Sequence, residues 1–438
     1  MQKWLLSLRN EFAGLMLWLT PGLGVKRWLF ILLMGITFLG VGVAYFLLDL
    51  YRTAPQSEFL DFVDVATLRF WPRPVRVAAF LIIGFGLVIW GIAGLNRALL
   101  NPFLRPGQRL IDQITVHRRR ERGPRVVVMG GGHGQSTLLR GLKHHTNNIT
   151  AIVTVADDGG SSGKLRQNLG ILPPGDIRNC LAALSNDEAM LTQLFQYRFS
   201  DSSGLGGHSF GNLFISALAD LTGSFEEAVA ESGRVLSVNG RVLPATLHDV
   251  RLVADVQLPG SLQEVRIEGE SRIPEAQGRV QRVYLEPNNP AAFPPSIKAI
   301  LMAEMVVVGP GSLYTSLLPT LLVPELVAAL RASKALKIYV VNIATQRGET
   351  SGYHVSDHIA ALEAHVGSNL FDVIVCNNVH EKPLPPGVEW VKIDAAAARY
   401  PLYPANLVDE EQPWRHDSLK LAQALIDLLY ERTGPLAE

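Results

Sequence analysis

The chain has 438 residues, with 40 Lys or Arg against 40 Asp or Glu, so its formal net charge is zero. A neutral chain has no bulk attraction for a nucleic-acid backbone, so nucleic acid is not an expected partner. Cys180 and Cys376 are the only cysteines. Two cysteines in so long a chain exclude a disulfide framework, and neither has metal-ligand spacing.

Two long apolar stretches near the amino terminus predict a transmembrane helical hairpin. Residues 28–48 are uncharged, and residues 75–95 contain only Arg76 as a charged residue. Each stretch is close to the ~20 residues that a helix needs to cross a bilayer. A cleaved signal peptide is the alternative for the first stretch, but the apolar run is too long and lacks a following cleavage site. A buried core hairpin is the alternative for the pair, and the length of both runs argues against it.

The basic residues around these stretches predict the orientation of the hairpin. Lys and Arg residues precede the first stretch and follow the second, whereas loop 49–74 contains both signs of charge. The positive-inside tendency therefore places both termini and the main domain in the cytoplasm of a bacterial cell, with loop 49–74 outside the membrane. Residues 1–27 are expected to lie on the membrane surface. Residues 96–124 are expected to form a basic juxtamembrane linker against anionic lipid. A nucleic-acid patch and a solvated linker are the alternatives for the basic run 118–125.

Residues 125–438 alternate between strand-like and helix-like segments. Continuous apolar runs at 126–129, 151–155, 305–308, 337–341 and 372–375 predict buried strands, and helical patterns such as 136–145 lie between them. This order is typical of a parallel sheet covered on both faces, so we expect an α/β, Rossmann-like, doubly wound domain. Residues 242–286 differ, because polar and apolar residues alternate there. They predict a small antiparallel β-rich insertion, and residues 416–432 predict an amphipathic closing helix.

The first predicted strand runs into a glycine-rich turn that opens a helix. Gly131, Gly132, His133 and Gly134 form this turn, and Ser136 follows it. Backbone N–H groups at a helix start face an anion, and glycine allows close approach of the backbone to phosphate. The turn therefore predicts a cradle for a nucleotide phosphate or sugar phosphate, with a plain turn as the alternative. No Gly-Lys-Ser or Gly-Lys-Thr ending follows, so it is not the usual P-loop.

The second predicted strand ends in an acidic, glycine-rich loop. Adjacent carboxylates at a strand end can bind Mg²⁺, hold a ribose hydroxyl or act as a base. The neighbouring glycines and serines suit a loop that wraps phosphate, and the basic residues can neutralise its charge. The candidate ligand-binding residues of this loop are Asp157, Asp158, Gly159, Ser161, Ser162, Lys164 and Arg166.

Further polar loops open helices or follow strands. Asp176 is placed as a helix cap, and Ser209 is placed as another, with His208 beside it as a candidate ligand or acid/base group. Because ligands bind beyond the carboxyl ends of parallel strands, these loops together predict a nucleotide or phosphosugar site. The additional candidates are Asp176, Arg178, Asn179, His208, Ser209, Gly211, Asn212, Gly311, Ser312, Thr315, Asn342 and Thr345.

The combined motifs resemble the YvcK family of gluconeogenesis factors, in the superfamily of the 2-phospho-lactate transferase CofD. The resemblance covers about residues 125–380 and departs from the usual pattern at His133 and Arg347. The motifs that carry it are Gly-Gly-Gly-His-Gly-Gln-Ser, Val-Ala-Asp-Asp-Gly-Gly-Ser-Ser-Gly, Pro-Pro-Gly-Asp-Ile-Arg-Asn-Cys, Gly-His-Ser-Phe-Gly-Asn-Leu, Gly-Pro-Gly-Ser-Leu-Tyr-Thr-Ser and Thr-Gln-Arg-Gly-Glu-Thr.

The resemblance implies a Rossmann-like fold that binds a UDP-sugar such as UDP-N-acetylglucosamine or UDP-glucose. It also implies a role in cell shape and wall synthesis on gluconeogenic carbon, with regulatory proteins of wall synthesis as partners. The usual members lack the membrane hairpin, so its presence implies a version that works at the membrane. Which nucleotide sugar binds, and whether the chain forms a homo-oligomer, stay open.

Three function classes follow from these features. The first is a regulatory UDP-sugar-binding protein without catalysis, which we expect most. The second is a CofD-like transferase of a phospho-acyl group from a nucleotide carrier, with Mg²⁺ on Asp157 or Asp158 and with Asp157, Asp158 and His208 as candidate catalytic residues. The third is an NAD-dependent oxidoreductase, which the absence of a Gly-x-Gly-x-x-Gly pattern disfavours.

Overall fold

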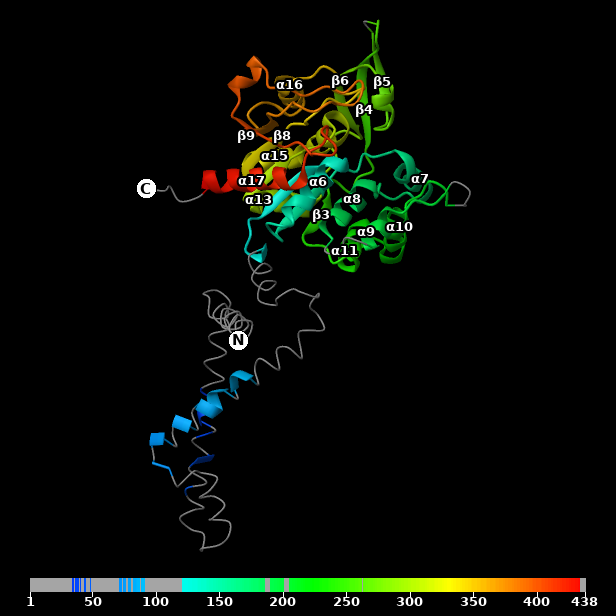
Figure 1. The fold of residues 1–438 in the computed structure, drawn as a ribbon. Coiled ribbons are helices and arrows are strands. Elements are labelled where there is room, and N and C mark those ends of the chain that lie inside the picture. The colour runs from blue at the N-terminus through cyan, green and yellow to red at the C-terminus, as the bar shows by residue number, and fades with distance from the viewer. Residues whose placement is uncertain are drawn as a thin grey trace. The chain divides into compact units, whose positions relative to one another are not determined.

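The computed structural model describes residues 120–185, 190–200, 205–261 and 263–433, together with scattered residues within 34–48 and 71–90. The chain divides into two compact units, Met1–Arg118 and Arg119–Glu438 (Figure 1). The second unit carries all of the predicted site residues.

Within Met1–Arg118, the described residues at 34–48 and 74–90 are helical and mostly exposed. Among the residues that the structure describes, no single helix is long and apolar enough to cross a membrane. One bent pair, Leu313–Leu321 with Pro324–Ala332, meets the limits of length and composition, but its apolar side chains pack in the core of the second unit. Only scattered residues of the predicted spans at 28–48 and 75–95 are described, and segment 1–27 and most of linker 96–124 lie outside the described residues, so all of these stay predictions.

The second unit is built on a seven-stranded parallel sheet, which confirms the predicted α/β class. Its strand order is β10-β9-β8-β7-β1-β2-β3. The chain runs outward from β1 in one direction and from β7 in the other, so the order reverses between these two strands. Ligands bind at such a switch point, beyond the carboxyl ends of the strands. The strands are β1 (Val126–Gly130), β2 (Ile149–Val153), β3 (Arg241–Pro244), β7 (Met305–Val308), β8 (Leu336–Val340), β9 (Val373–Asn377) and β10 (Leu402–Ala405).

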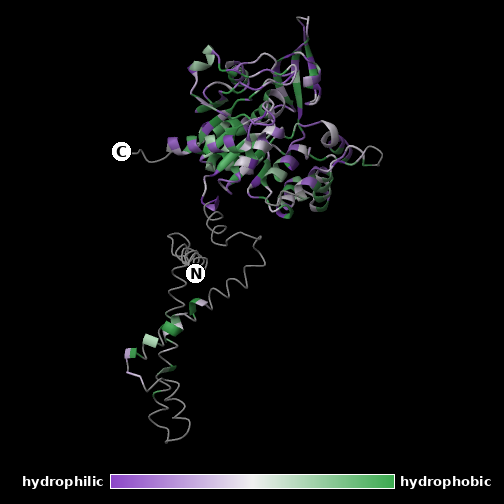
Figure 2. Ribbon diagram, in the orientation of Figure 1, coloured by the Kyte–Doolittle hydropathy of each residue, from purple (hydrophilic) through white to green (hydrophobic). Residues whose placement is uncertain are grey.

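Two apolar layers cover the sheet, because successive side chains of a strand point to opposite faces. In β1, Val127 and Met129 join one layer, and Val126 and Val128 join the other. Figure 2 shows this apolar interior as green ribbon in the middle of the unit. The first layer packs against α13 (Pro294–Met302), α14 (Leu318–Leu321), α15 (Pro324–Ala332) and α16 (Val355–Val366).

The other layer is covered by helices from both ends of the domain. The closing helix α17 packs against α6, and α6 packs against α8. The helices on this side are α6 (Gly132–Leu142), α8 (Gly175–Leu184), α9 (Met190–Gln196), α10 (Phe210–Thr222), α11 (Phe225–Val235) and α17 (Ser418–Thr433). The remaining helices are α7 (Gly160–Leu169), α12 (Arg272–Glu275), the π-helix Leu313–Leu317 and the 3₁₀-helix Ala395–Arg399.

The predicted β-rich insertion is present as a three-stranded antiparallel sheet of order β5-β4-β6, although its bounds differ from the prediction. The strands are β4 (Arg251–Gln257), β5 (Glu264–Glu268) and β6 (Arg279–Glu286). The start of the predicted range, residues 242–244, belongs instead to β3 of the parallel sheet, where Val242 pairs with Ala151. The apolar side chains of β4 and β6 pack on the same layer as α13–α16.

The first helix begins four residues before the predicted start at Ser136. Gly132, His133 and Gly134 form the first turn of α6 and are not a loop before it. Gly132 has a φ of +67°, a backbone conformation that glycine adopts without strain. The glycine cluster therefore turns the chain and begins the helix at the same place.

Candidate functional site

The start of α6 is held by a carboxyl group from α8, because Asp176 accepts a hydrogen bond from the backbone N–H of Gly132. Gly131 is the cap residue, and it makes no side-chain hydrogen bond to the helix. A Cβ on Gly134 would clash with the backbone carbonyl of Pro310, so glycine is required where the loops after β1 and β7 meet. Free N–H groups at a helix start are suited to bind an anion. Ser136 is buried and donates to the carbonyl of His133 at 2.9 Å, which braces the turn from within.

The loop after β7 forms the opposite wall of the site. Asn342, after β8, donates to the carbonyl of Gly311 at 2.8 Å and accepts from its N–H at 3.2 Å. Ser312 donates to the side chain of Gln346 at 2.7 Å. Two loops from neighbouring strands therefore fix each other at the switch point.

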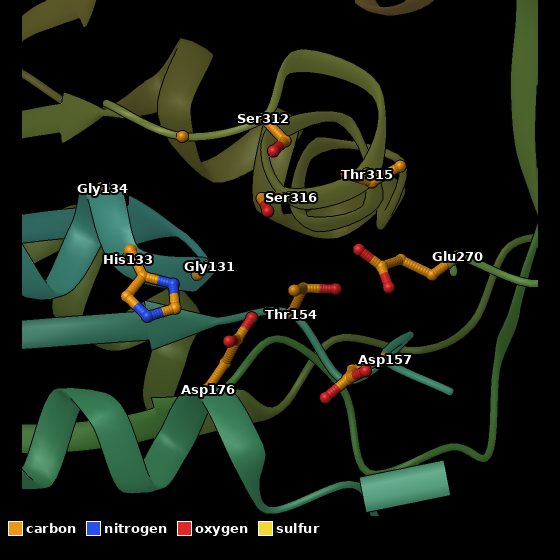
Figure 3. A pocket seen from close by; sticks show the side chains of 12 residues that line it. Gly131, His133, Gly134, Thr154, Asp157, Asp176, Glu270, Ser312, Thr315 and Ser316 are labelled. Atoms are coloured by element: carbon orange, nitrogen blue, oxygen red, sulfur yellow. The ribbon is translucent and has the colours of Figure 1, made fainter. Parts of the chain in front are cut away.

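A cavity of about 320 Å³ lies between these walls. Figure 3 shows Ser312, Ser316 and Thr315 along one side of it, Asp176, Thr154 and Asp157 along the opposite side, and Glu270 entering between Thr315 and Asp157. Its lining consists of Gly131, Gly132, His133, Gly134, Thr154, Asp157, Asp176, Glu270, Gly311, Ser312, Thr315 and Ser316.

The carboxyl groups of this first cavity hold their protons more tightly than usual. Burial, followed by the charges of Asp157 and Asp176, raises the pKa of Glu270 to about 8. Burial and the charge of Asp157 raise the pKa of Asp176 to about 6, and burial also raises the pKa of Asp157. Crowded, poorly solvated carboxyls disfavour their charged forms. The cavity thus presents both donors and acceptors of hydrogen bonds near neutral pH.

Glu349 supports this cavity from behind. Its carboxylate accepts from the hydroxyl of Thr315 at 3.0 Å, the side chain of Gln346 at 2.8 Å and the backbone N–H of Tyr314 at 3.3 Å. Burial raises the pKa of Glu349 to about 7. The buried carboxylate therefore ties the π-helix after Ser312 to the loop that follows β8.

A second cavity of about 430 Å³ adjoins the first. The two share His133, Gly134 and Gly311. Burial and then the charge of Arg415 lower the pKa of His133, which favours the neutral form of its ring at this junction. The remaining lining residues are Thr137, Pro310, Asn342, Ile343, Ala344, Thr345, Gln346, Arg347, Val388, Trp414, Arg415 and His416.

The adjacent carboxylates of the acidic loop have different surroundings. Asp157 lines the first cavity, whereas Asp158 accepts the backbone N–H of Ser271 at 2.9 Å and does not line it. Within the described part of the chain, no group of three or more His, Cys, Asp or Glu residues has an arrangement that could hold a metal ion. Asp157 with Asp176, and not Asp157 with Asp158, is therefore the carboxyl pair of the cavity.

A separate polar cluster contains several other predicted residues. Ser161 contacts the ring of His208 at 3.1 Å and accepts from Asn212 at 3.0 Å. Arg178 is buried and bonds to Ser209. These side chains join α7, α8 and α10 beside the cavity.

The structure brings together eleven of the predicted site residues along the two cavities. Of the others, Arg166 bonds to the carbonyl of Val250 at 2.6 Å and pairs with Asp249, and Lys164 is exposed. The predicted residues that line neither cavity are Ser136, Asp158, Gly159, Ser161, Ser162, Lys164, Arg166, Arg178, Asn179, His208, Ser209, Gly211 and Asn212.

The sequence prediction missed several lining residues. Ser316 and Arg347 belong to motifs that the sequence analysis recognised, and Trp414, Arg415 and His416 form an aromatic and basic run just before the closing helix. These could have been found. No sequence pattern marks Glu270 as a site residue, because only the folding of the insertion brings it to the cavity.

Comparisons with known proteins agree with this fold. The family model described as 2-phospho-L-lactate transferase CofD matches residues 126–423. A gluconeogenesis factor of Bacillus subtilis is 42% identical over 70% of this chain and 99% of its own length. A Clostridium acetobutylicum protein named as a candidate gluconeogenesis factor is 40% identical over 95% of this chain and 92% of its own.

A solved structure has the same fold. The crystal structure of a UPF0052 family member from Bacillus halodurans is 42% identical, with a TM-score of 0.64, and the match covers 70% of this chain and 99% of that one. Sequence, fold and a cavity at the switch point thus agree, and the chain belongs to the YvcK family of gluconeogenesis factors, within the CofD superfamily.

Proposed function

We propose that this chain binds a UDP-sugar across the two adjoining cavities. The observation that carries the proposal is their shared junction, where His133, Gly134 and Gly311 separate two spaces of different chemistry. The second cavity has Arg347 and Arg415, whereas the first has carboxyl and hydroxyl groups. A ligand with an anionic centre near the arginines and a hydroxyl-rich end among the carboxyl groups matches this arrangement.

In this proposal the diphosphate lies at the junction. The N-terminus of α6 supplies a positive dipole end and the backbone donors other than the Gly132 N–H, which Asp176 accepts, and Arg415 supplies charge. The sugar extends into the first cavity, where carboxyl groups can accept from its hydroxyls. The base lies in the second cavity against Trp414 and Ile343.

The role we propose is regulatory binding without catalysis. Relatives carry the name gluconeogenesis factor, and the proposed ligand is UDP-N-acetylglucosamine or UDP-glucose. Binding would report nucleotide-sugar supply to proteins that control wall synthesis and cell shape on gluconeogenic carbon.

A CofD-like transferase is the second candidate. The matching family model carries that description, and the first cavity contains carboxyl groups with raised pKa values suited to proton transfer. Asp157 and Asp176 supply the oxygen ligands that Mg²⁺ prefers, and bound Mg²⁺ would neutralise charge on a transferred group.

We also propose that the amino-terminal unit tethers the domain to the cytoplasmic membrane. The described residues at 34–48 and 74–90 are helical, and apolar side chains among them, including Phe38, Ile82 and Trp90, are exposed. Residues 1–118 form more than a quarter of the chain, so a Clostridium relative matched over 95% of it shares most of them. The Bacillus subtilis relative matches over only 70%. A reporter fused after Glu438 that is active only outside the cytoplasm would contradict the tether and its orientation.

Calorimetric titration of the full chain tests the ligand. The injected compounds are UDP-N-acetylglucosamine, UDP-glucose, GDP and NAD, each with and without Mg²⁺, and products are analysed afterwards. We expect saturable binding of the UDP-sugars without turnover. Mg²⁺-dependent consumption of a nucleotide would support the transferase, and binding of none of the UDP-sugars would contradict the proposed function.

A further inference from the structure

One carboxyl group enters the first cavity from outside the parallel sheet. Glu270 lies between β5 and α12 of the insertion. Figure 3 shows its carboxylate directed into the space between Thr315 and Asp157. Within the described part of the chain, no hydrogen bond or ion pair to this carboxylate is formed. Glu270 is therefore free to interact with whatever occupies the cavity.

One hydrogen bond and two close approaches at glycines hold the segment that carries Glu270. Asp158 accepts the N–H of Ser271 at 2.9 Å, and a Cβ on Gly269 would clash with the carboxylate of Asp158. Gly269 also has a φ of +108°, which a side chain would oppose. The loop after β8 also packs closely on α12, because a Cβ on Gly348 would clash with the backbone carbonyl of Pro274. The position of Glu270 is therefore set by Asp158 and by the packing of α12 against the loop after β8.

The charges that face Glu270 are mostly negative. Asp157, Asp176, Glu349 and Asp158 all act on its carboxyl group, in that order of strength. Arg272, the nearby cation on α12, does not line the first cavity and lines instead a separate groove formed by β5 and α12. A second anionic group in this cavity would meet like charges in a poorly solvated space, where repulsion is strong.

We propose that Glu270 makes the first cavity selective for an uncharged, hydroxyl-bearing sugar over a sugar that carries a carboxylate, and that Asp158 is the residue that positions Glu270. This inference rests on the proposed binding of a UDP-sugar. A neutral hydroxyl donates to an ionised carboxyl and accepts from a protonated one, so it fits this cavity in either state. A sugar carboxylate has no proton to donate to an ionised carboxyl group. It is repelled by Asp176, which is largely ionised at pH 7, and by Glu270 as that group ionises.

The test compares UDP-glucose with UDP-glucuronate, which differ only at C6, for binding to the full chain at pH 7 and pH 9. Their shared diphosphate cancels in the ratio of the two affinities. We expect at least a tenfold preference for UDP-glucose at pH 7. The preference should grow at pH 9, because the pKa of Glu270 is about 8 and its charge develops over this interval.

Two variants isolate Glu270. Glu270→Gln should remove most of the growth of the ratio between pH 7 and pH 9, because Glu270 lines the cavity and ionises in this interval. Glu349, with a pKa of about 7, does not line the cavity and accounts for the remainder. The matched control is Glu268→Gln, two residues away, where the half-exposed carboxylate pairs with Arg266. This control should keep the wild-type ratio at both pH values.

Asp158 is tested by its own pair of variants. Asp158→Ala removes the acceptor of the Ser271 N–H and should flatten the pH profile of the ratio as Glu270→Gln does. Asp158→Asn keeps an oxygen acceptor and should retain the wild-type profile. Equal loss in both variants would overturn the positioning role of Asp158.

UDP alone separates failure of the selectivity from failure of the proposed ligand. If UDP-glucose and UDP-glucuronate bind equally, or if UDP-glucose binds no more tightly than UDP, the selectivity is overturned while nucleotide binding stands. If none of the three nucleotides binds, both proposals are overturned.

Discussion

Asn342 holds both polar groups of the Gly311 backbone with a single side-chain amide. It donates to the carbonyl at 2.8 Å and accepts from the N–H at 3.2 Å, which joins the loops after β7 and β8. Only an amide matches this pair, because Asp lacks the donor and Leu lacks both groups. Asn342 therefore joins the two loops together with the bond from Ser312 to Gln346.

We expect Asn342→Leu to weaken UDP-sugar binding and to lower the free energy of unfolding by about 1–3 kcal/mol, the cost of unsatisfied polar groups in a part-buried site. Calorimetry and thermal unfolding measure the two effects. The control is Asn378→Leu, at an exposed position that lines neither cavity. A full-affinity Asn342→Leu variant would show that these loops do not contact the ligand.

Gly134→Ala should disrupt the site strongly, although it adds only one methyl group. The added Cβ meets the backbone of Pro310, which cannot move as a flexible side chain can. We expect a loss of about 1–3 kcal/mol in stability from overpacking, together with weaker ligand binding. Gly233→Ala is the matched control, because its Cβ in α11 would meet only Leu181 and Val238 at ordinary distances of 3.7 and 3.9 Å. Equal melting temperatures for the two variants would contradict the close approach.

Arg415→Gln should weaken UDP-sugar binding by about 1.5–3 kcal/mol, the usual worth of a hydrogen bond to a charged group. Because Arg415 is exposed, salt should weaken wild-type binding and affect the variant less. Calorimetric titration at low and high ionic strength measures both effects. Arg432→Gln, at the exposed end of α17, should behave as wild type. Wild-type affinity in Arg415→Gln would place the diphosphate elsewhere.

Glu349 should make the fold less stable as the pH rises. Its folded pKa of about 7 lies above the ordinary value of 4.5. The folded state therefore retains a proton that the unfolded state has lost, and stability falls between about pH 4.5 and 7. Glu349→Gln should reduce this fall, as measured by melting temperatures across that range. An unchanged pH slope would show that the carboxyl is not desolvated.

His416 should act in the opposite direction. Burial lowers its pKa to about 4 from 6.5, so its contribution to stability is present above pH 6.5 and is lost as the pH falls toward 4. His416→Gln should lessen acid destabilisation in that window. If the variant and wild type lose stability equally between pH 6.5 and 4, the histidine is not buried in its neutral form.

The fold could be predicted from the sequence because its strands are continuous apolar runs. Met305–Val308 was predicted with the right bounds, whereas β10 was missed, since Leu402–Ala405 is short and lies at the edge of the sheet. The place of the cavity could also be predicted, because glycine-rich loops mark the carboxyl ends of strands.

The roles of individual polar residues could be predicted less well. Asp157 and Asp158 are neighbours in sequence, yet one lines the cavity and the other holds the backbone of Ser271. Loop conformation decides between such roles, and residue type does not reveal it. Glu270 was missed because its place depends on how the insertion packs, which no local pattern encodes.

The most direct test of a UDP-sugar site at the switch point is a crystal structure of the protein with UDP-N-acetylglucosamine. We expect the diphosphate between the N-terminus of α6 and Arg415, the base against Trp414 and the sugar beside Asp157 and Glu270. A ligand bound outside both cavities, or a sugar directed away from the carboxyl groups, would contradict this placement.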